Sequence, residues 1–133
     1  MKPLLIIACL TAGTFATSAQ DCQLKTSGLY ITKVLDENGN RKYLRFTGDG
    51  TLLKIFSDER ADYVARWLTA DREGIVPVKY KMEKCAIEFT VKKKSGKFHY
   101  RGQIEGDSII LQQYANKNSK PVELIYRFAP VKQ

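Results

Sequence analysis

The chain of 133 residues is poor in the residues from which catalytic and metal sites are usually built. It has one histidine, one tryptophan and three cysteines. His99 alternates with Lys97 and Arg101 along its predicted strand, so its neighbours on that face are cations and offer no acid–base partner. No set of His, Cys and carboxylate residues has metal-site spacing, and no glycine-rich phosphate loop or nucleophile elbow occurs. The sequence therefore predicts no catalytic residue, no bound metal and no cofactor, and we expect the protein not to be an enzyme.

Long hydrophobic runs are also missing. The longest is residues 4–10, which follow a positively charged start at Lys2 and precede small residues at 17–19. This run is far shorter than the ~20 residues that a membrane-spanning helix needs, and the three-part layout is typical of a secretory signal peptide. We predict a signal peptide at residues 1–19, no membrane span, and a single domain at residues 20–133. Cys9 leaves one alternative open, acylation as in a lipoprotein.

Cleavage after residue 19 leaves only Cys22 and Cys85. Two cysteines in an exported domain most simply form one disulfide, and closing a loop of this length stabilises a fold by roughly 4 kcal/mol. The alternative is a metal or redox pair, which the wide separation and the lone histidine support poorly. The cysteines therefore predict a disulfide that joins the mature N-terminus to the start of a central strand, in a bacterial protein that is periplasmic or extracellular.

Acidic residues are in the minority. The chain has 22 Lys and Arg against 14 Asp and Glu, a formal net charge of +8 at pH 7. Such an excess favours anionic partners such as lipid headgroups, acidic polysaccharides or acidic proteins, although export argues against nucleic acid. The residues Lys92, Lys93, Lys94, Lys97 and Arg101 form a basic hairpin tip and rim. This feature is either a site for an anionic partner or a charged turn that keeps sheet edges from aggregating.

Helical periodicity is confined to one stretch. Ala61, Val64, Ala65 and Leu68 follow the i, i+3, i+4, i+7 pattern, which predicts a helix within 57–71 with Ser57 as its N-cap. We expect this helix to cover one end of a barrel or a sheet edge. Strands are predicted at 28–35, in a hairpin at 41–56, and at 78–83, 85–92, 97–105, 108–114 and 121–128. About eight short strands in sequential hairpin order predict an all-β, antiparallel up-and-down (meander) barrel with one short helix after the third strand.

The hairpin at 41–56 is the clearest local signal. Asp49-Gly50 between two alternating runs predicts a two-residue type I′ turn with Gly48 opposite Thr51. The resulting register pairs Phe46 with Leu53, and Leu44 with Ile55, on one apolar face. Such a face is what a strand pair lining a core requires.

The same register places Arg45 directly opposite Lys54 on the other face of the hairpin. Like charges in this position are unfavourable unless water, an acidic neighbour or a bound anion lies against them. The pair is therefore a candidate site for a carboxylate at a cavity mouth, unless the acidic residues at 58–59 satisfy it.

Aromatic residues recur at the positions predicted to face inward. They are Phe46, Phe89, Phe98, Tyr100, Tyr126 and Phe128. Ligand pockets are mostly apolar with a few placed polar groups, so these residues are candidates to line a ligand site. An eight-stranded barrel is just wide enough either to be filled by its own side chains or to hold one small ligand. The sequence leaves both possibilities open.

Several short motifs occur in an order that resembles the small secreted bacterial lipocalin-like domains of the calycin group. They are Gly28-x-Tyr30, the hairpin motif from Tyr43 to Thr51, Trp67-Leu68, Lys79-Tyr80-Lys81, Ile87-x-Phe89, the Tyr100 to Asp107 motif, and Tyr126-x-Phe128. The resemblance covers residues 28–128. It implies a closed sheet that holds a small apolar molecule, and it supplies no catalytic residues.

Two functions are compatible with these features. One is an exported, monomeric lipocalin-like protein that binds a small apolar or amphipathic ligand, with the cations favouring an acidic head. The other is a periplasmic protein-interaction module, of inhibitor or immunity type, that uses loops and a basic face.

Overall fold

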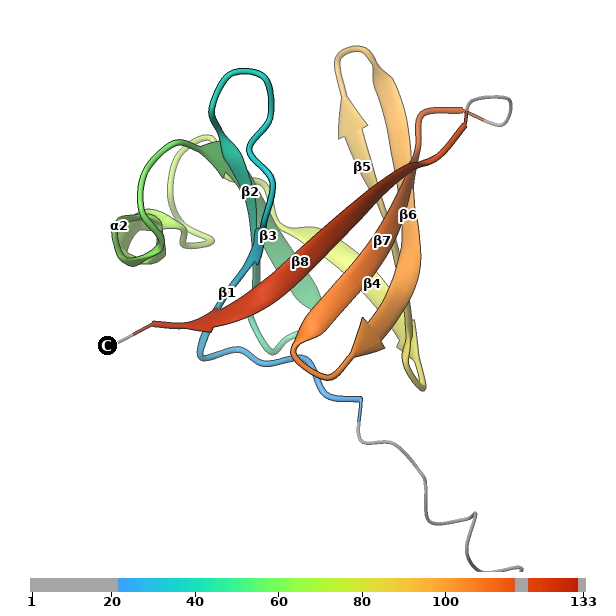
Figure 1. Ribbon diagram of the computed structural model, residues 1–133, viewed down its shortest axis with the longest axis horizontal. Helices are drawn as coiled ribbons and strands as arrows, with labels where there is room; N and C mark the ends of the chain where they lie inside the picture. The colour runs from blue at the N-terminus through green and yellow to red at the C-terminus, as the bar shows by residue number, and fades with distance from the viewer. Residues whose placement is uncertain (1–21, 117–119, 132–133) are drawn as a thin grey trace, which may run out of the picture.

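Antiparallel hairpins follow one another along the chain and close into a barrel (Figure 1). The computed structural model describes residues 22–116 and 120–131. Its elements are β1 (Gly28–Thr32), β2 (Arg41–Phe46), β3 (Thr51–Ser57), α2 (Ala61–Trp67), β4 (Val78–Glu83), β5 (Ala86–Lys93), β6 (Gly96–Glu105), β7 (Ser108–Tyr114) and β8 (Val122–Pro130). Each strand pairs with the next, and β8 pairs with β1. The predicted eight-stranded meander barrel is confirmed. The predicted signal peptide and Cys9 lie outside the described residues.

Strand alternation in the second half of the chain predicts which residues face inward, and most of these positions are confirmed, but Val122, predicted inward, is 56% exposed. The buried interior cluster consists of Tyr30, Leu44, Phe46, Leu52, Ile87, Phe89, Tyr100, Ile104, Ile109, Leu111 and Tyr126. Strand alternation explains this, because residues at i and i+2 share a face of the sheet.

The loop between β2 and β3 is one residue longer than predicted. Thr47 lies opposite Thr51 and its amide donates to the Thr51 carbonyl oxygen at 3.2 Å. Positive φ angles occur at Gly48 and Gly50, not at Asp49. The Asp49 carboxylate accepts hydrogen bonds from the Thr51 amide (3.1 Å), the Thr51 hydroxyl (2.6 Å) and the Thr47 hydroxyl. Because these bonds hold a three-residue loop, the predicted type I′ turn is wrong.

The longer loop reverses the faces of β3. Leu44 is opposite Lys54, and Arg45 is opposite Leu53. A shift of one residue moves every side chain of a strand to the other face. The interior face of this hairpin therefore carries Leu44, Phe46, Leu52 and Lys54, and the outer face carries Tyr43, Arg45, Leu53 and Ile55. The predicted pairing of Arg45 with Lys54 is wrong, and so is the inward placement of Leu53 and Ile55.

Helix α2 is shorter than predicted and lies on the outer face of the barrel. It begins after Arg60 because Ser57 still belongs to β3, where its hydroxyl accepts the Glu59 amide at 3.0 Å. The apolar stripe is confirmed: Val64, Ala65 and Leu68 are buried against outward residues of β1, β2 and β3. The expectation that the helix covers a barrel end or a sheet edge is wrong, since Figure 1 shows it beside the barrel wall.

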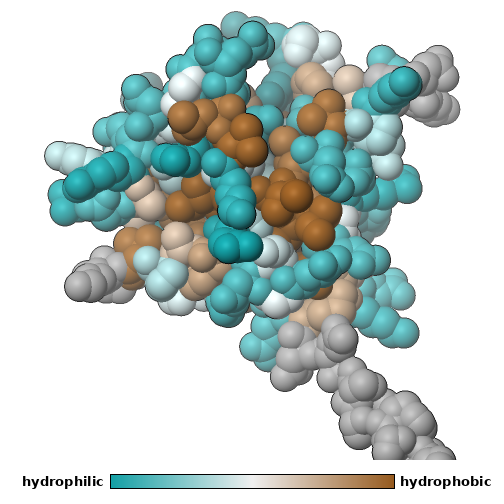
Figure 2. Space-filling model, viewed as in Figure 1, coloured by the Kyte–Doolittle hydropathy of each residue, from teal (hydrophilic) through white to brown (hydrophobic). Residues whose placement is uncertain are grey.

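Strand β1 ends at Thr32, three residues earlier than predicted. The Asp36 carboxylate accepts the amides of Asn38 and Asn40, both at 2.9 Å, and so closes a tight loop after the strand. Val34 and Leu35 are left 79% and 48% exposed. Hydrophobic residues also reach the surface on the face shown in Figure 2, in patches bordered by hydrophilic ones.

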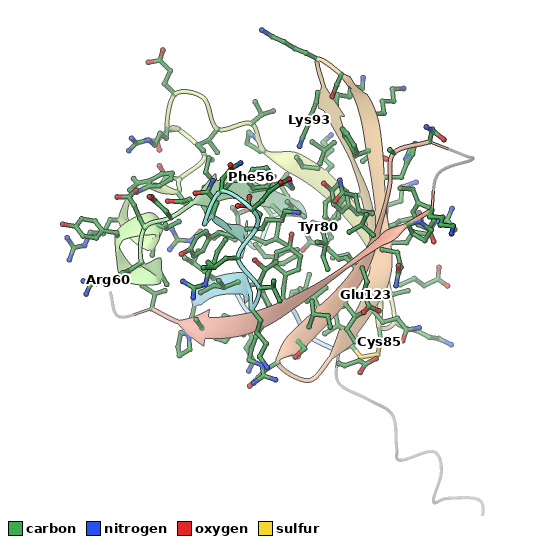
Figure 3. The ribbon with its side chains drawn as sticks, turned by 45° about the horizontal axis from the view of Figure 1, so that its top comes forward. Phe56, Arg60, Tyr80, Cys85, Lys93 and Glu123 are labelled. Carbon is green, nitrogen blue, oxygen red and sulfur yellow. A yellow bond between two sulfur atoms is a disulfide. The ribbon has the colours of Figure 1, made fainter. Side chains whose placement is uncertain are left out.

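The two ends of the barrel differ. Because neighbouring strands are antiparallel, the connections after β1, β3, β5 and β7 share one end, here called the open end. At the other, closed end, Cys22 and Leu24 pack against the interior cluster, and the Lys25 amide donates to the Tyr30 hydroxyl at 3.0 Å. The predicted Cys22–Cys85 disulfide is present and ties this segment to the turn before β5. Figure 3 shows Cys85 far from Phe56 and Lys93.

Gly102 is required by close approach between β6 and β7. A Cβ atom at this position would lie 1.9 Å from the Ile110 carbonyl oxygen and 2.8 Å from the Leu111 Cα atom. The obstacle is backbone, which cannot rotate away as a side chain can.

We expect Gly102→Ala to lower the free energy of unfolding by about 1–3 kcal/mol, because the added methyl group must push two strands apart. The neighbouring exposed residue supplies the control, since Gln103→Ala removes surface atoms only and should stay within about 0.5 kcal/mol of the parent. Urea denaturation followed by circular dichroism measures both. Equal stability of the Gly102→Ala variant and the parent would contradict the close approach.

Candidate functional site

Towards the closed end, the barrel interior is filled by aromatic rings. The Phe46 ring meets Tyr30 edge-on at 5.5 Å between centroids and meets Tyr80 edge-on at 5.2 Å. Phe128 lies 5.2 Å from Tyr30 on the other side. Edge-to-face contacts of this kind add to the stabilisation from burial. This half of the interior is therefore a packed core.

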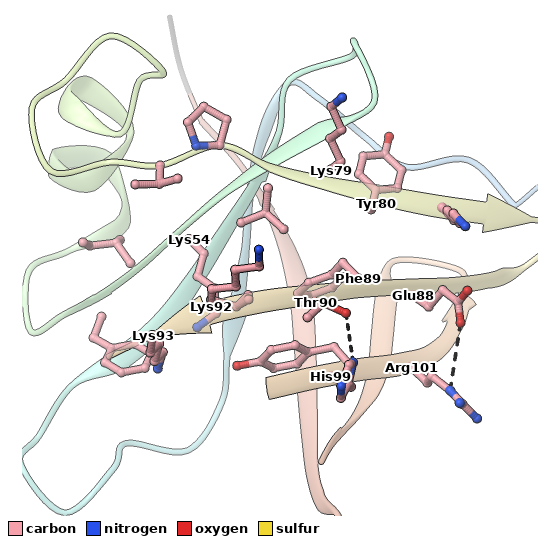
Figure 4. Close-up of a pocket in the computed structure, with 18 of the residues that line it drawn as sticks. Lys54, Lys79, Tyr80, Glu88, Phe89, Thr90, Lys92, Lys93, His99 and Arg101 are labelled. Carbon is pink, nitrogen blue, oxygen red and sulfur yellow. Dashed lines mark hydrogen bonds and ion pairs between the residues drawn. The ribbon is translucent and has the colours of Figure 1, made fainter. Parts of the chain in front are cut away.

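Towards the open end, the wall of the barrel parts between β3 and β5. The register of β3 with β4 covers only Thr51 and Leu52, and that of β4 with β5 covers only Tyr80–Glu83. Beyond these pairs, β3 and β5 have no strand partner on this side within the described residues. A cavity of about 830 Å³ occupies the gap (Figure 4). Its apolar lining comes from Phe56, Val76, Val78, Tyr80, Phe89, Val91 and Tyr100. Charged and polar side chains make up nearly half of the lining, and those on the outer face of β5 and β6 are Glu88, Thr90, Lys92, His99 and Arg101.

Three lysines converge on the ring of Phe56 at the rim of this cavity. The Nζ atoms of Lys54, Lys93 and Lys42 lie 4.8, 5.2 and 5.5 Å from the ring centroid. They come from β3, β5 and β2, and we call them the lysine cluster. Within residues 22–116 and 120–131, none of the three forms an ion pair with a carboxylate. Contact with the ring face stabilises each cation weakly, and the charge of Asp36 favours the charged form of Lys42 without an ion pair between the two.

Lys54 is the member of the cluster that points into the barrel. Its Nζ also lies 5.4 Å from the centroid of Tyr100. Burial, together with the positive charges of Lys93 and Lys42, lowers the pKa of Lys54 to about 8. Burial also lowers the pKa of Lys42, although Asp36 opposes that change. Both shifts have the sign expected for an ammonium group that loses hydration on burial.

Arg45, predicted to share a site with Lys54, lies on the opposite face of the barrel wall. One guanidinium nitrogen donates to the carbonyl oxygens of Ala65 (2.7 Å) and Leu68 (3.0 Å). These are free carbonyl groups at the C-terminal end of α2, where a cation is favourable. Arg45 therefore fixes the helix to the barrel and is absent from the cavity lining.

The six predicted aromatic residues all belong to or pack against the interior cluster. Only Phe89 and Tyr100 among them line the cavity, with their rings stacked 4.6 Å apart. Sequence reasoning missed Phe56, which the wrong register placed on the outer face, and Tyr80, which it named only within the Lys79-Tyr80-Lys81 motif. The predicted basic hairpin contributes Lys93 to the cluster. The lysines of that hairpin tip, Lys93 included, are exposed, and Lys92 and Arg101 also line the cavity.

Two tyrosine hydroxyls are polar groups in the interior. Burial raises the pKa of Tyr100 to about 12. The pKa of Tyr126 is raised more than that of Tyr100, mainly by burial and to a smaller extent by the charge of ionised Tyr100. The Tyr126 hydroxyl has no hydrogen-bond partner among the described residues. An unpaired buried hydroxyl costs roughly 1–3 kcal/mol, so a hydrogen-bonding partner there would be stabilising.

His99 lies on the outer face of β6, as predicted, where its Nδ1 is 2.9 Å from the Thr90 hydroxyl (Figure 4). In the same figure, Arg101 reaches Glu88 across the strand pair at 3.9 Å. These are cross-strand contacts between exposed residues. Over the described ranges, no group of three or more His, Cys, Asp or Glu residues could hold a metal ion.

A helix able to cross a membrane is absent from the part of the chain that the structure describes. The chain matches no family model, and no curated protein or solved structure is significantly similar to it. The barrel is compatible with the lipocalin-like fold that the sequence motifs suggested.

We expect Lys54→Met to stabilise the protein at pH 7. Lys54 loses its proton near pH 8 in the folded protein and near pH 10.4 in the unfolded chain. Below pH 8 the folded state holds a buried, unpaired charge, which costs about 2 kcal/mol after allowance for solvent screening. Between these pKa values the unfolded chain binds more protons, so the parent protein gains stability relative to the variant as the pH rises.

Urea denaturation at pH 7 and pH 10 measures this difference. The exposed residue Lys97, changed to Met, is the matched control and should show no such pH dependence. A Lys54→Met variant that is less stable than the parent at pH 7, or a difference that is independent of pH, would contradict the burial of an unpaired ammonium.

Proposed function

We propose that the protein is an exported, lipocalin-like binding protein for a small amphipathic anion, such as a long-chain carboxylate. The apolar chain of the ligand occupies the cavity between β3 and β5, and its acidic head lies against the lysine cluster. The observation that carries this proposal is the convergence of Lys42, Lys54 and Lys93 on Phe56 without a carboxylate partner.

The energetics of the cluster support this assignment. Each of the three ammonium groups would gain from an anion, and Lys54 would gain most because it is the most desolvated. A carboxylate held there would restore a charge-assisted hydrogen bond that the folded protein lacks. The cavity volume of about 830 Å³ falls within the range of small-molecule sites, and cations far outnumber the one carboxylate, Glu88, among its lining residues.

The architecture also supports entry from the open end. The closed end is covered by the N-terminal segment, which the disulfide holds in place. The gap between β3 and β5 gives the ligand a route that requires no unfolding of strand pairs. The disulfide fits an exported protein, so export forms part of this proposal.

A second candidate function rests on the same gap. The unpaired edges of β3 and β5 are places where an extended segment of another protein adds a strand. Lys92, Lys93 and Lys94 beside that edge would favour an acidic segment. This would make the protein an interaction module of inhibitor or immunity type.

Calorimetric titration tests the ligand proposal with three molecules of equal chain length. Dodecanoate should bind saturably with 1:1 stoichiometry, dodecanol more weakly, and dodecylammonium at least about tenfold more weakly than dodecanoate. Lys54→Met should weaken dodecanoate binding by about tenfold, which corresponds to about 1.4 kcal/mol. Lys97→Met, which removes one exposed charge, should leave the affinity unchanged. Equal affinities for dodecanoate and dodecylammonium, or no saturable binding, would overturn the proposal.

The second candidate predicts a different result. An acidic peptide in extended conformation should bind with a 1:1 ratio and protect amides of β3 residues 53–57 from hydrogen exchange, because a new ladder forms there. Protection should be unaffected by Lys54→Met, since strand addition uses the backbone. A protein that binds dodecanoate and shows no protection with the peptide would exclude this candidate.

A further inference from the structure

We propose that Lys54 is also a site of reversible covalent binding, at which its amine condenses with the aldehyde group of an apolar molecule held in the cavity to form an imine. This inference uses the cavity of the proposed function but goes beyond it, because it requires bond formation by one lysine instead of ion pairing by three. The ligand class is an aliphatic or aromatic aldehyde.

The placement of the amine favours this reaction. The Nζ atom of Lys54 lies between the rings of Phe56 and Tyr100, at 4.8 and 5.4 Å from their centroids, and it borders the cavity. An apolar chain packed against Tyr80 and Phe89 would extend along the same wall towards this atom (Figure 4). Binding of the chain would hold a carbonyl carbon close to one particular amine, and such positioning replaces a bimolecular encounter with an intramolecular one.

The surroundings also keep the Lys54 amine neutral, and therefore nucleophilic, in a fraction of the molecules near neutral pH. A lysine amine becomes nucleophilic when it is desolvated in an apolar pocket or lies beside another cation, and Lys54 meets both conditions. With its lowered pKa, the neutral fraction at pH 7.5 is roughly 200-fold larger than that of an exposed lysine. A less basic amine is a weaker nucleophile, as for thiols, so the expected net gain in rate is on the order of tenfold.

The step is balanced without an oxidant or a reductant. The nitrogen lone pair forms a bond to the carbonyl carbon, and the carbonyl oxygen takes up a proton as the tetrahedral carbinolamine forms. Loss of this oxygen as water, with the remaining nitrogen proton returned to solvent, leaves a carbon–nitrogen double bond. The net change is condensation of one aldehyde with one amine and release of one water molecule.

The groups that face Lys54 set the pH at which this occurs. Lys42 on β2 and Lys93 on β5 are cations that favour its neutral form. Tyr100 on β6 stays protonated through neutral pH, as does Tyr80 on β4. Imine formation at Lys54 should therefore rise with a midpoint near pH 8, well below that of an exposed lysine.

The experiment incubates the full-length protein with decanal and sodium cyanoborohydride, which reduces any imine to a stable secondary amine. Peptide mapping by mass spectrometry then locates the added decyl group. We expect Lys54 to be modified about tenfold faster than the exposed Lys97 at pH 7.5, with a pH profile centred near 8. Labelling that is spread over the lysines according to their exposure would overturn the proposal, and so would a profile at Lys54 that follows that of Lys97.

Two variants sharpen the comparison. Lys54→Arg keeps the charge but has no condensing amine, so fast labelling should disappear; Lys97→Arg should leave labelling of Lys54 unchanged. Because the site is mapped in the parent protein, the test stands even where Lys54→Arg folds poorly. The dodecanoate titration is a separate measurement: binding without selective labelling overturns this inference alone, and selective labelling without dodecanoate binding overturns the proposed function alone.

Discussion

The cavity and its cations depend on the three-residue loop between β2 and β3. The carboxylate of Asp49 accepts hydrogen bonds from Thr47 and Thr51 and so sets Thr47 opposite Thr51. This single register decides which residues of β3 face inward. Lys54 enters the barrel and Leu53 turns towards α2. A loop shorter by one residue would place Leu53 inside and Lys54 outside, and the lysine cluster would not exist.

The same barrel combines a packed end with an accessible one. Rings of Tyr30, Phe46 and Phe128 fill the closed end, and the disulfide keeps the N-terminal segment against it. Beyond Leu52 β3 has no partner on this side, because β4 begins only at Val78, opposite Leu52. The fold therefore has a packed core in one half and a cavity in the other.

The chemistry of the cavity follows from what surrounds Lys54. An ammonium group loses hydration on burial, and a paired carboxylate offsets part of that cost. Here the nearest partners are two aromatic rings and two further lysines. In the proposed function, all three charges would attract a bound anion. In the further proposal, an aldehyde would react with the neutral form of one amine.

Local patterns in the sequence predicted the strands, the meander order, the helix stripe of Val64, Ala65 and Leu68, and the pairing of Cys22 with Cys85. Each follows from alternation, periodicity or residue counting, which depend on neighbours along the chain. They also predicted Lys54 and the aromatic lining residues Phe89 and Tyr100, although Lys54 was placed on the wrong face.

Only the tertiary structure decided the register of β3, the position of α2 and the separation of Arg45 from Lys54. The Asp49 carboxylate stabilises a three-residue loop in place of the two-residue turn that an Asp-Gly pair favours. This difference of one residue in loop length moves every side chain of β3 to the other face of the sheet. Lys42 lies directly opposite Phe56 in the β2–β3 hairpin, and Lys54 is two residues before Phe56 on β3, so the corrected register accounts for both. Lys93 comes from β5, about 40 residues further along the chain, and only the fold of the sheet brings it to the same ring.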